Sequence, residues 1–108
     1  MEAKIRNFLP KDRERLKAIC KETAWDDYKK DSNKLETVPI MFLDYFMDYE
    51  SNLIFVAINE KDEAIGYIEC ASSYHDFIKI NKQVYFPLLK KIDKSQIRFI
   101  KTFFLLYF

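Results

Sequence analysis

The stretch SNLIFVAINEKDEAIGYIEC, Ser51 to Cys70, decides the fold. It holds two apolar runs, LIFVAI and AIGYI, on either side of the charged segment Asn59 to Glu63, which is typical of two strands joined by a turn. The first run is apolar on both faces and therefore predicts an interior strand. Gly66, the single glycine of the chain, stands inside the second run, where a glycine usually marks a bulge or a close backbone approach.

The residues before this hairpin predict a strand and a helix. Lys4 to Phe8 alternates in polarity like a short strand. Pro10 suits the first position of a helix, and Asp12 suits the positive end of the helix dipole. An apolar stripe at helical spacing follows, formed by Leu16, Ile19 and Cys20.

The next segment, TAWDDYKKDSNKLET from Thr23 to Thr37, has no period and predicts mostly loop. A second helix is expected to begin near Pro39. Its predicted apolar stripe has the spacing i, i+4 and i+7 and consists of Phe42, Phe46 and Tyr49. Leu43 and Met47 lie beside this stripe.

After the hairpin, SYHDFIKINKQVYFPLLKKID has helical spacing, with a break or kink expected at Pro87. The segment Gln96 to Phe108 predicts a last, apolar edge strand. The predicted fold is α/β (α+β) in the order β-α-α-β-β-α-β, with a mixed, mostly antiparallel sheet in one domain over residues 1–108.

Composition excludes several classes of function. With 108 residues, 49% of them hydrophobic and 32% charged, the chain is expected to be one globular domain. The net charge of +1 gives no electrostatic footprint for nucleic acid. The sequence contains no run of eighteen apolar residues, so no membrane-spanning helix is expected. Cys20 and Cys70 are expected to be reduced cysteines of a cytoplasmic protein, because they lack the spacing of metal ligands.

Few residues carry a chemical signal. Ser72, Ser73, His75 and Asp76 stand together, but a serine–histidine–acid triad is normally assembled from distant segments, and a helix cap explains the same residues. The chain lacks phosphate-loop and dinucleotide motifs, and no metal site is expected. The segment AWDDYKKD, Ala24 to Asp31, has two interpretations. It is a solvated loop around a buried tryptophan, or an aromatic wall with carboxylates that receive an amine.

The order of elements and the hairpin resemble the N-terminal half of the GNAT N-acetyltransferase superfamily. The resemblance rests on IRNFLPKDRERLKAIC, on YFMDYESNLIFVAINEKDEAIGYIEC with its FVA and IGYI patterns, and on the helix that follows. It covers roughly Lys4 to Ile92. Within the superfamily the chain looks most like a bacterial branch related to the acetyltransferase-like domain of O-GlcNAc hydrolases.

The resemblance implies transfer of an acetyl group from acetyl-CoA to an amine acceptor, a small molecule or a peptide. It places Trp25, Asp26, Asp27 and Tyr28 on the acceptor side. The glycine-rich loop that holds the acetyl-CoA pyrophosphate in the family has no counterpart after Gly66, so no catalytic or cofactor-binding residue is carried over.

The end of the chain supports an alternative expectation. KTFFLLYF, Lys101 to Phe108, reads as an apolar edge strand or as the tail of a truncated or frameshifted gene product. An unpaired apolar strand favours association. The alternative is a non-catalytic, truncated GNAT-like module that forms a homodimer or higher association through this strand.

Overall fold

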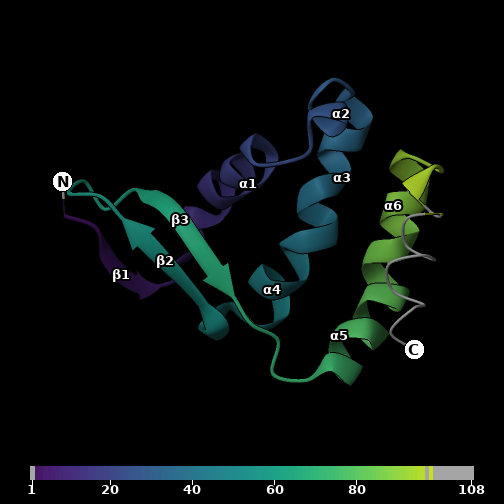
Figure 1. The fold of residues 1–108 in the computed structure, drawn as a ribbon. Helices are drawn as coiled ribbons and strands as arrows, with labels where there is room; N and C mark the ends of the chain where they lie inside the picture. The colour runs from purple at the N-terminus through teal and green to yellow at the C-terminus, as the bar shows by residue number, and fades with distance from the viewer. Residues whose placement is uncertain (1, 97, 99–108) are drawn as a thin grey trace.

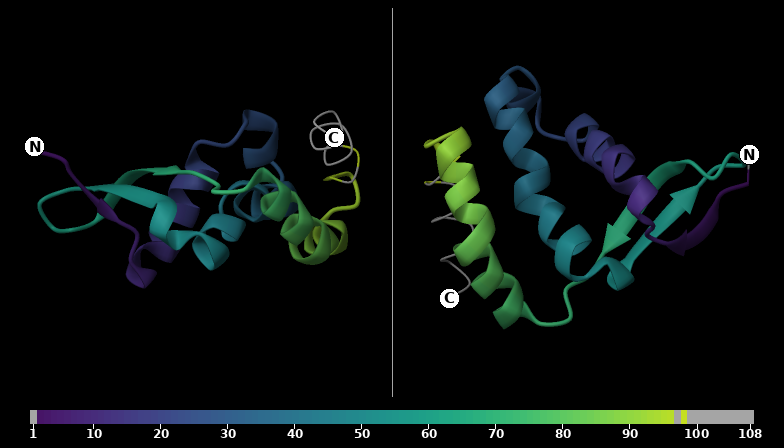
Figure 2. Two further views of the ribbon diagram at one scale, coloured as in Figure 1. Left: turned by 90° about the horizontal axis from the view of Figure 1, so that it is seen from below. Right: turned by 180° about the vertical axis from the view of Figure 1, so that it is seen from behind.

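The computed structural model of this protein describes residues 2–96 and 98. A three-stranded antiparallel sheet in the order β1-β2-β3 lies at one end of the molecule, and the helices pack beside and behind it (Figures 1 and 2). The strands are β1 (Lys4–Asn7), β2 (Ile54–Ile58) and β3 (Ala64–Glu69). The helices are α1 (Arg13–Glu22), α2 (Asp26–Lys29), α3 (Ser32–Phe42), α4 (Asp44–Tyr49), α5 (Tyr74–Ile80) and α6 (Phe86–Ile92). Short 3₁₀ turns at Pro10–Asp12 and Ser51–Leu53 precede α1 and β2.

The predicted hairpin is confirmed, with β2 as the central strand and a bulge beside Gly66. Ala57 pairs with Gly66 and Ile58 pairs with Ala64, so Ile65 is the extra residue of the bulge. A Cβ atom at Gly66 would meet only the Cβ of Ala57, at 4.0 Å, and the backbone there has no positive φ. The hairpin therefore does not itself require a glycine at this position.

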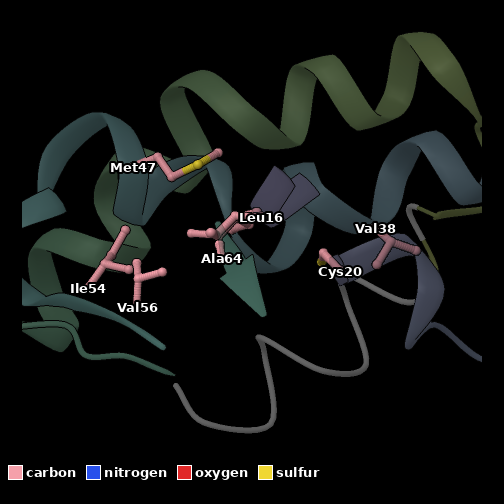
Figure 3. Close-up of a cluster of buried hydrophobic side chains, with 8 residues drawn as sticks. Leu16, Cys20, Val38, Met47, Ile54, Val56 and Ala64 are labelled. Atoms are coloured by element: carbon pink, nitrogen blue, oxygen red, sulfur yellow. The ribbon is translucent and has the colours of Figure 1, made fainter. Parts of the chain in front are cut away.

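The hydrophobic core lies between the inner face of the sheet and helices α1, α3 and α4. Leu16 and Cys20 of α1 are buried, as their helical spacing predicts. They contact a cluster from the other elements, shown in Figure 3: Val38, Leu43, Met47, Ile54, Val56 and Ala64. Three helices thus cover one face of the sheet.

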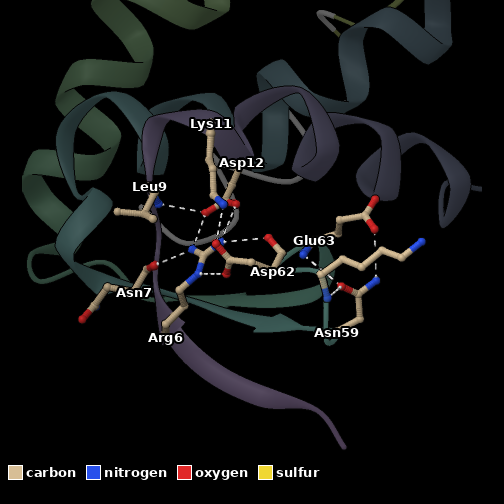
Figure 4. A network of polar contacts seen from close by, with 9 residues as sticks. Arg6, Asn7, Leu9, Lys11, Asp12, Asn59, Asp62 and Glu63 are labelled. Atoms are coloured by element: carbon tan, nitrogen blue, oxygen red, sulfur yellow. Dashed lines mark hydrogen bonds and ion pairs between the residues drawn. The ribbon is translucent and has the colours of Figure 1, made fainter. Parts of the chain in front are cut away.

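A partly buried ion pair ties the first strand to the rest of the fold (Figure 4). The guanidinium of Arg6 donates two hydrogen bonds to the carboxylate of Asp12, at 2.7 and 2.9 Å, and a third to Asp62 at 2.7 Å. Asp12 also accepts a hydrogen bond from the backbone of Leu9 at 2.8 Å. Lys11 forms an ion pair with Asp62 in the β2–β3 turn. The network holds β1, the start of α1 and the hairpin turn together.

The prediction that residues 23–37 are mostly loop is wrong. Helix α2 occupies Asp26–Lys29, and α3 begins at Ser32, seven residues before the expected start at Pro39. The side chain of Asp31 accepts hydrogen bonds from the backbone of Asn33 and Lys34, which caps α3.

The predicted stripe of the second helix is only partly correct. Leu43 and Met47 are buried, and Phe42 and Phe46 pack against the core, but Tyr49 is 53% exposed. The helix ends at Phe42 and restarts at Asp44, and this interruption rotates the following aromatic residues away from a single continuous face.

The helix after the hairpin is confirmed, and its irregularity lies just before the predicted break. Helix α5 continues through a π-helical segment, Asn81–Tyr85, into α6, where Pro87 stands in the first turn and needs no backbone N–H partner. This long element lies alongside α3 (Figure 1). Of the predicted edge strand 96–108, the structure describes Gln96 and Arg98, both in helical conformation, and the remainder lies outside the described residues.

Among the helices described for this chain, none is long and apolar enough to cross a membrane.

Candidate functional site

A cavity of about 470 Å³ lies between the end of α4 and the start of α5. Glu50, which follows α4, stands at one side of it, and Ser72, in the connection from β3 to α5, stands beside Glu50. The residues that give the cavity its chemistry are Tyr45, Tyr49, Glu50, Ser72, Asp76 and Lys79. We call this hollow the Glu50 cavity.

Glu50 is a buried and ionised carboxylate. Its residue is 7% exposed. Oε1 accepts a 2.8 Å hydrogen bond from the backbone N–H of Ser72 and another from the Ser72 hydroxyl. Burial raises the pKa of Glu50, but these bonds and an interaction with the Tyr45 hydroxyl outweigh it, so the pKa lies below the ordinary value. No hydrogen bond of normal geometry among the described residues reaches the buried Oε2 atom.

Two tyrosines form an aromatic wall of the same cavity. The rings of Tyr45 and Tyr49 are stacked, with centroids 5.6 Å apart and an interplanar angle of 19°. Burial and the neighbouring Glu50 raise the pKa of Tyr45 to about 12, so its hydroxyl stays protonated at neutral pH. Asp76 adds a second carboxylate to the lining and Lys79 adds one positive charge. A cationic group fits this arrangement, because it would meet two carboxylates and aromatic ring faces.

The four residues predicted for the acceptor side lie elsewhere, around the short helix α2. Trp25 is 54% exposed, so the buried tryptophan of the loop interpretation is wrong. Its ring contacts Tyr28 edge-to-face, with centroids 5.2 Å apart, and the Tyr28 hydroxyl donates to Gln96 at 2.9 Å. Asp26 and Asp27 are exposed in the first turn of α2. A role of these four residues in acceptor binding stays a prediction.

A second, more apolar cavity of about 280 Å³ lies beside Trp25. Its lining includes Cys20, Trp25, Val38, Phe42 and Tyr67, but neither Asp26 nor Asp27. It therefore combines one of the predicted residues with the core of α1, α3 and β3, and leaves out the two predicted carboxylates.

Glu69, at the end of β3, is a carboxyl group that sequence analysis missed. Burial raises its pKa to about 8, and its Oε2 atom has no hydrogen-bond partner among the residues described. Its charge raises the pKa of Cys20 and of Tyr67, although burial is the larger cause for both groups. The strand alternation of IGYIEC contained the signal. Tyr67 and Glu69 alternate onto the same face of β3, where they pair with the buried Val56 and Ile54 of β2.

The cluster around His75 is a helix cap, as expected. The Ser73 hydroxyl accepts a hydrogen bond from the backbone N–H of Asp76 at 3.2 Å and caps α5. Ser72 donates its hydroxyl to Glu50. His75 is exposed in the first turn of α5. These contacts do not form the geometry of a catalytic triad.

The N-termini of α3 and α5 do not fit the pyrophosphate of acetyl-CoA. Such a group needs unoccupied backbone N–H groups at a helix N-terminus. At α3, the carboxylate of Asp31 already accepts from Asn33 and Lys34, at 3.0 and 3.2 Å. At α5, Ser73 occupies the backbone N–H of Asp76, whose own negative charge stands in the first turn. A second anion at either position would meet a carboxylate and bonded donors.

No group of three or more metal-binding side chains is present within residues 2–96 and 98. Cys20 and Cys70 are free cysteines, the first buried and the second exposed.

Comparison with solved structures supports the fold. The crystal structure of SsHAT matches this chain with a TM-score of 0.69 at 22% sequence identity. The match covers 84% of this chain and 46% of SsHAT, so the chain spans about half the length of its structural neighbour. No family model matches the sequence. No curated protein matches it either. The chain therefore has the α+β arrangement of a GNAT-like partial fold, and the comparison shows the fold alone.

Proposed function

We propose that this chain is the acceptor-binding part of a GNAT-like N-acetyltransferase, and that the Glu50 cavity binds the ammonium group of an amine acceptor. The observation that carries the proposal is the ionised carboxylate of Glu50 in the lining of a cavity that also holds two tyrosine rings and a second carboxylate, Asp76. An ammonium group in this cavity would form a charge-assisted interaction with the Glu50 carboxylate.

Each wall of the cavity has a role in this proposal. Glu50 serves as the counter-ion of the ammonium group, because a pKa below the ordinary value makes it a poor proton acceptor. Tyr45 and Tyr49 present aromatic surface to the carbon chain of the amine. Asp76 adds negative charge at the other side. The N-termini of α3 and α5 have no part in binding acetyl-CoA in this proposal, because their backbone donors are occupied.

The experiment is a calorimetric titration of the 108-residue chain with phenethylamine, compared with N-acetylphenethylamine. The amine is cationic at neutral pH and its acetylated form is neutral. We expect saturable binding of the amine and at least about tenfold weaker binding of the acetylated form, because a charge-assisted hydrogen bond contributes about 1.5–3 kcal/mol. Equal affinities would contradict the proposal.

Two matched variants locate the site. Glu50→Gln keeps an oxygen that accepts from Ser72 but removes the charge, and we expect it to lose amine binding. Asp26→Asn removes an exposed carboxylate near Trp25 and should bind the amine like the wild type. Loss of binding in Asp26→Asn, with Glu50→Gln unaffected, would instead favour the Trp25–Tyr28 segment as the acceptor site. A thermal unfolding curve of each variant establishes that it is folded.

A second candidate is a non-catalytic GNAT-like module that dimerises through residues 96–108. It is favoured by the occupied N-termini of α3 and α5, which do not fit acetyl-CoA. The two candidates differ in the amine titration, since a module without an acceptor site would bind neither probe. Micromolar binding of acetyl-CoA by this chain would count against both.

A further inference from the structure

The wall of the Glu50 cavity that α5 forms carries charges of both signs. Asp76, Lys79 and Gln83 all line the cavity. They stand three and four residues apart, a spacing that places side chains on one face of a helix in successive turns. Asp76 lies in the first turn of α5 and Lys79 in its last turn, while Gln83 belongs to the π-helical segment that follows. Along the helix axis the wall therefore changes from negative to positive.

The carboxylate of Glu50 lies at the negative end of this wall. It accepts a 2.8 Å hydrogen bond from the backbone N–H of Ser72, which precedes the first residue of α5 by two positions. Burial raises the pKa of Tyr45, and the charges of Glu50 and Asp76 raise it further, so both carboxylates lie within electrostatic range of the same hydroxyl. Lys79 stands about 4.5 Å further along the helix axis than Asp76, at 1.5 Å per residue.

The two charges of the α5 wall are not paired with each other. A separation of three residues on a helix allows an ion pair. Among the residues that the structure describes, however, neither Asp76 nor Lys79 forms an ion pair with any side chain. Both side chains are exposed and thus accessible to a ligand in the cavity. An acceptor whose only charge is an ammonium group would match Glu50 but would leave Lys79 without a counter-charge.

We propose that the acceptor of the Glu50 cavity is a zwitterionic α-amino acid, with its ammonium group at Glu50 and Asp76 and its carboxylate at Lys79. This inference rests on the proposed function, because it specifies the amine that the cavity binds. An α-amino acid carries both charges on one carbon atom. It therefore presents a cation to the carboxylates and an anion to the lysine at the same time, which is the charge complementarity that selects one partner over another.

The remaining walls indicate which kind of amino acid fits. The stacked rings of Tyr45 and Tyr49 and the side chain of Ile80 offer apolar surface to a side chain of the ligand. The volume of about 470 Å³ lies in the range of small-molecule sites. A peptide N-terminus has a neutral amide in the position of the α-carboxylate, so Lys79 favours a free amino acid with an aromatic or apolar side chain over a peptide.

A calorimetric titration with L-phenylalanine beside phenethylamine tests the inference, because the two probes differ only by the carboxylate. We expect the wild-type chain to bind L-phenylalanine about two- to fivefold more tightly, the range of an exposed ion pair. Lys79→Gln removes the charge and keeps a polar side chain, so the preference should disappear. Lys79→Glu places a third carboxylate at the cavity and should reverse the preference in favour of phenethylamine.

Lys90→Gln is the matched control, since Lys90 is exposed on α6 and does not line the cavity. It should keep the wild-type preference. A wild-type chain that binds phenethylamine as tightly as L-phenylalanine, or more tightly, would overturn the inference and leave the proposed function intact. A preference for L-phenylalanine that persists in both Lys79 variants would overturn it as well. If neither probe binds, the proposed function itself is contradicted, and the inference fails with it.

Discussion

At the scale of single residues, the fold contains two carboxyl groups whose burial has opposite consequences. Asp12 is paired with Arg6, which holds the pKa of Asp12 below its ordinary value. Glu69 has no partner for its Oε2 atom, and burial raises its pKa to about 8. The first group stabilises the folded chain when it is ionised, and the second destabilises it.

Glu69 predicts a loss of stability toward alkaline pH. Its pKa in the folded chain, about 8, exceeds the value of 4.5 for an unperturbed glutamate, so the folded chain binds the extra proton between these values. The contribution of Glu69 to the free energy of unfolding should therefore fall as the pH rises from about 5 to about 8. Chemical denaturation at several pH values measures it.

Glu69→Gln should remove this part of the pH dependence and should stabilise the chain above pH 8 by roughly 1–3 kcal/mol, a range set by the cost of an unsatisfied buried group. The exposed Glu63→Gln is the matched control and should leave the pH dependence unchanged. If the free energy of unfolding of Glu69→Gln changed with pH as it does in the wild type, Glu69 would be solvated in the folded chain.

Asp12 predicts the opposite behaviour in acid. Because Arg6 lowers the pKa of Asp12, the stabilisation by this pair is present above the ordinary value of 3.8 and is lost as the pH falls through the lowered pKa. Asp12→Asn should cost roughly 1–3 kcal/mol at pH 7, since it leaves the guanidinium of Arg6 without its charged partner. Urea denaturation of this variant beside Asp27→Asn, at an exposed position, checks the value, and equal stabilities would contradict it.

At the scale of elements, the starts of α3 and α5 each carry a side-chain cap. Asp31 caps α3 through hydrogen bonds from Asn33 and Lys34. Asp31→Ala should destabilise the chain by about 1 kcal/mol. Asp31→Ser retains a capping oxygen and should recover most of the loss in the same denaturation experiment. Two variants of equal stability would mean that α3 does not depend on this cap.

In β3, Gly66→Ala should be tolerated. The added Cβ atom would lie 4.0 Å from Ala57, which is ordinary contact, and alanine loses less conformational freedom on folding than glycine. A gain of about 0.5–1 kcal/mol in the monomer is expected. A destabilised Gly66→Ala monomer would show that the strand itself needs the glycine.

The elements with strong local signals were predictable from the sequence, and those without were not. The hairpin follows from two apolar runs around a polar turn, and α1 follows from the spacing of Leu16 and Cys20. The start of α3 was missed because its first two turns carry few apolar residues, and the cap at Asp31 is a single residue in a polar segment. The burial of Glu69 depends on helices that are distant in sequence, so strand alternation alone does not indicate its raised pKa.

At the scale of the whole molecule, the candidate site forms where two segments that are distant in the sequence come into contact. Glu50 follows the aromatic helix α4, whereas Ser72 lies in the connection before α5 and Asp76 lies in the first turn of α5. Taken alone, the residues of each segment have a structural explanation, as part of a helix or of a helix cap. The sequence offered Trp25–Tyr28 as the acceptor side, which stays a prediction, and gave no signal for the Glu50 cavity, because nothing local indicates that Glu50 and Ser72 lie in contact.

The central claim is that the Glu50 cavity binds an amine, and a crystal structure of the chain grown with phenethylamine tests it most directly. The account predicts the ammonium nitrogen at about 2.7–2.9 Å from a carboxylate oxygen of Glu50, the distance of a charge-assisted hydrogen bond, with the phenyl ring against Tyr45 or Tyr49. An amine bound beside Trp25 and Asp26, or a Glu50 cavity that stays without the ligand at saturating concentration, would contradict it.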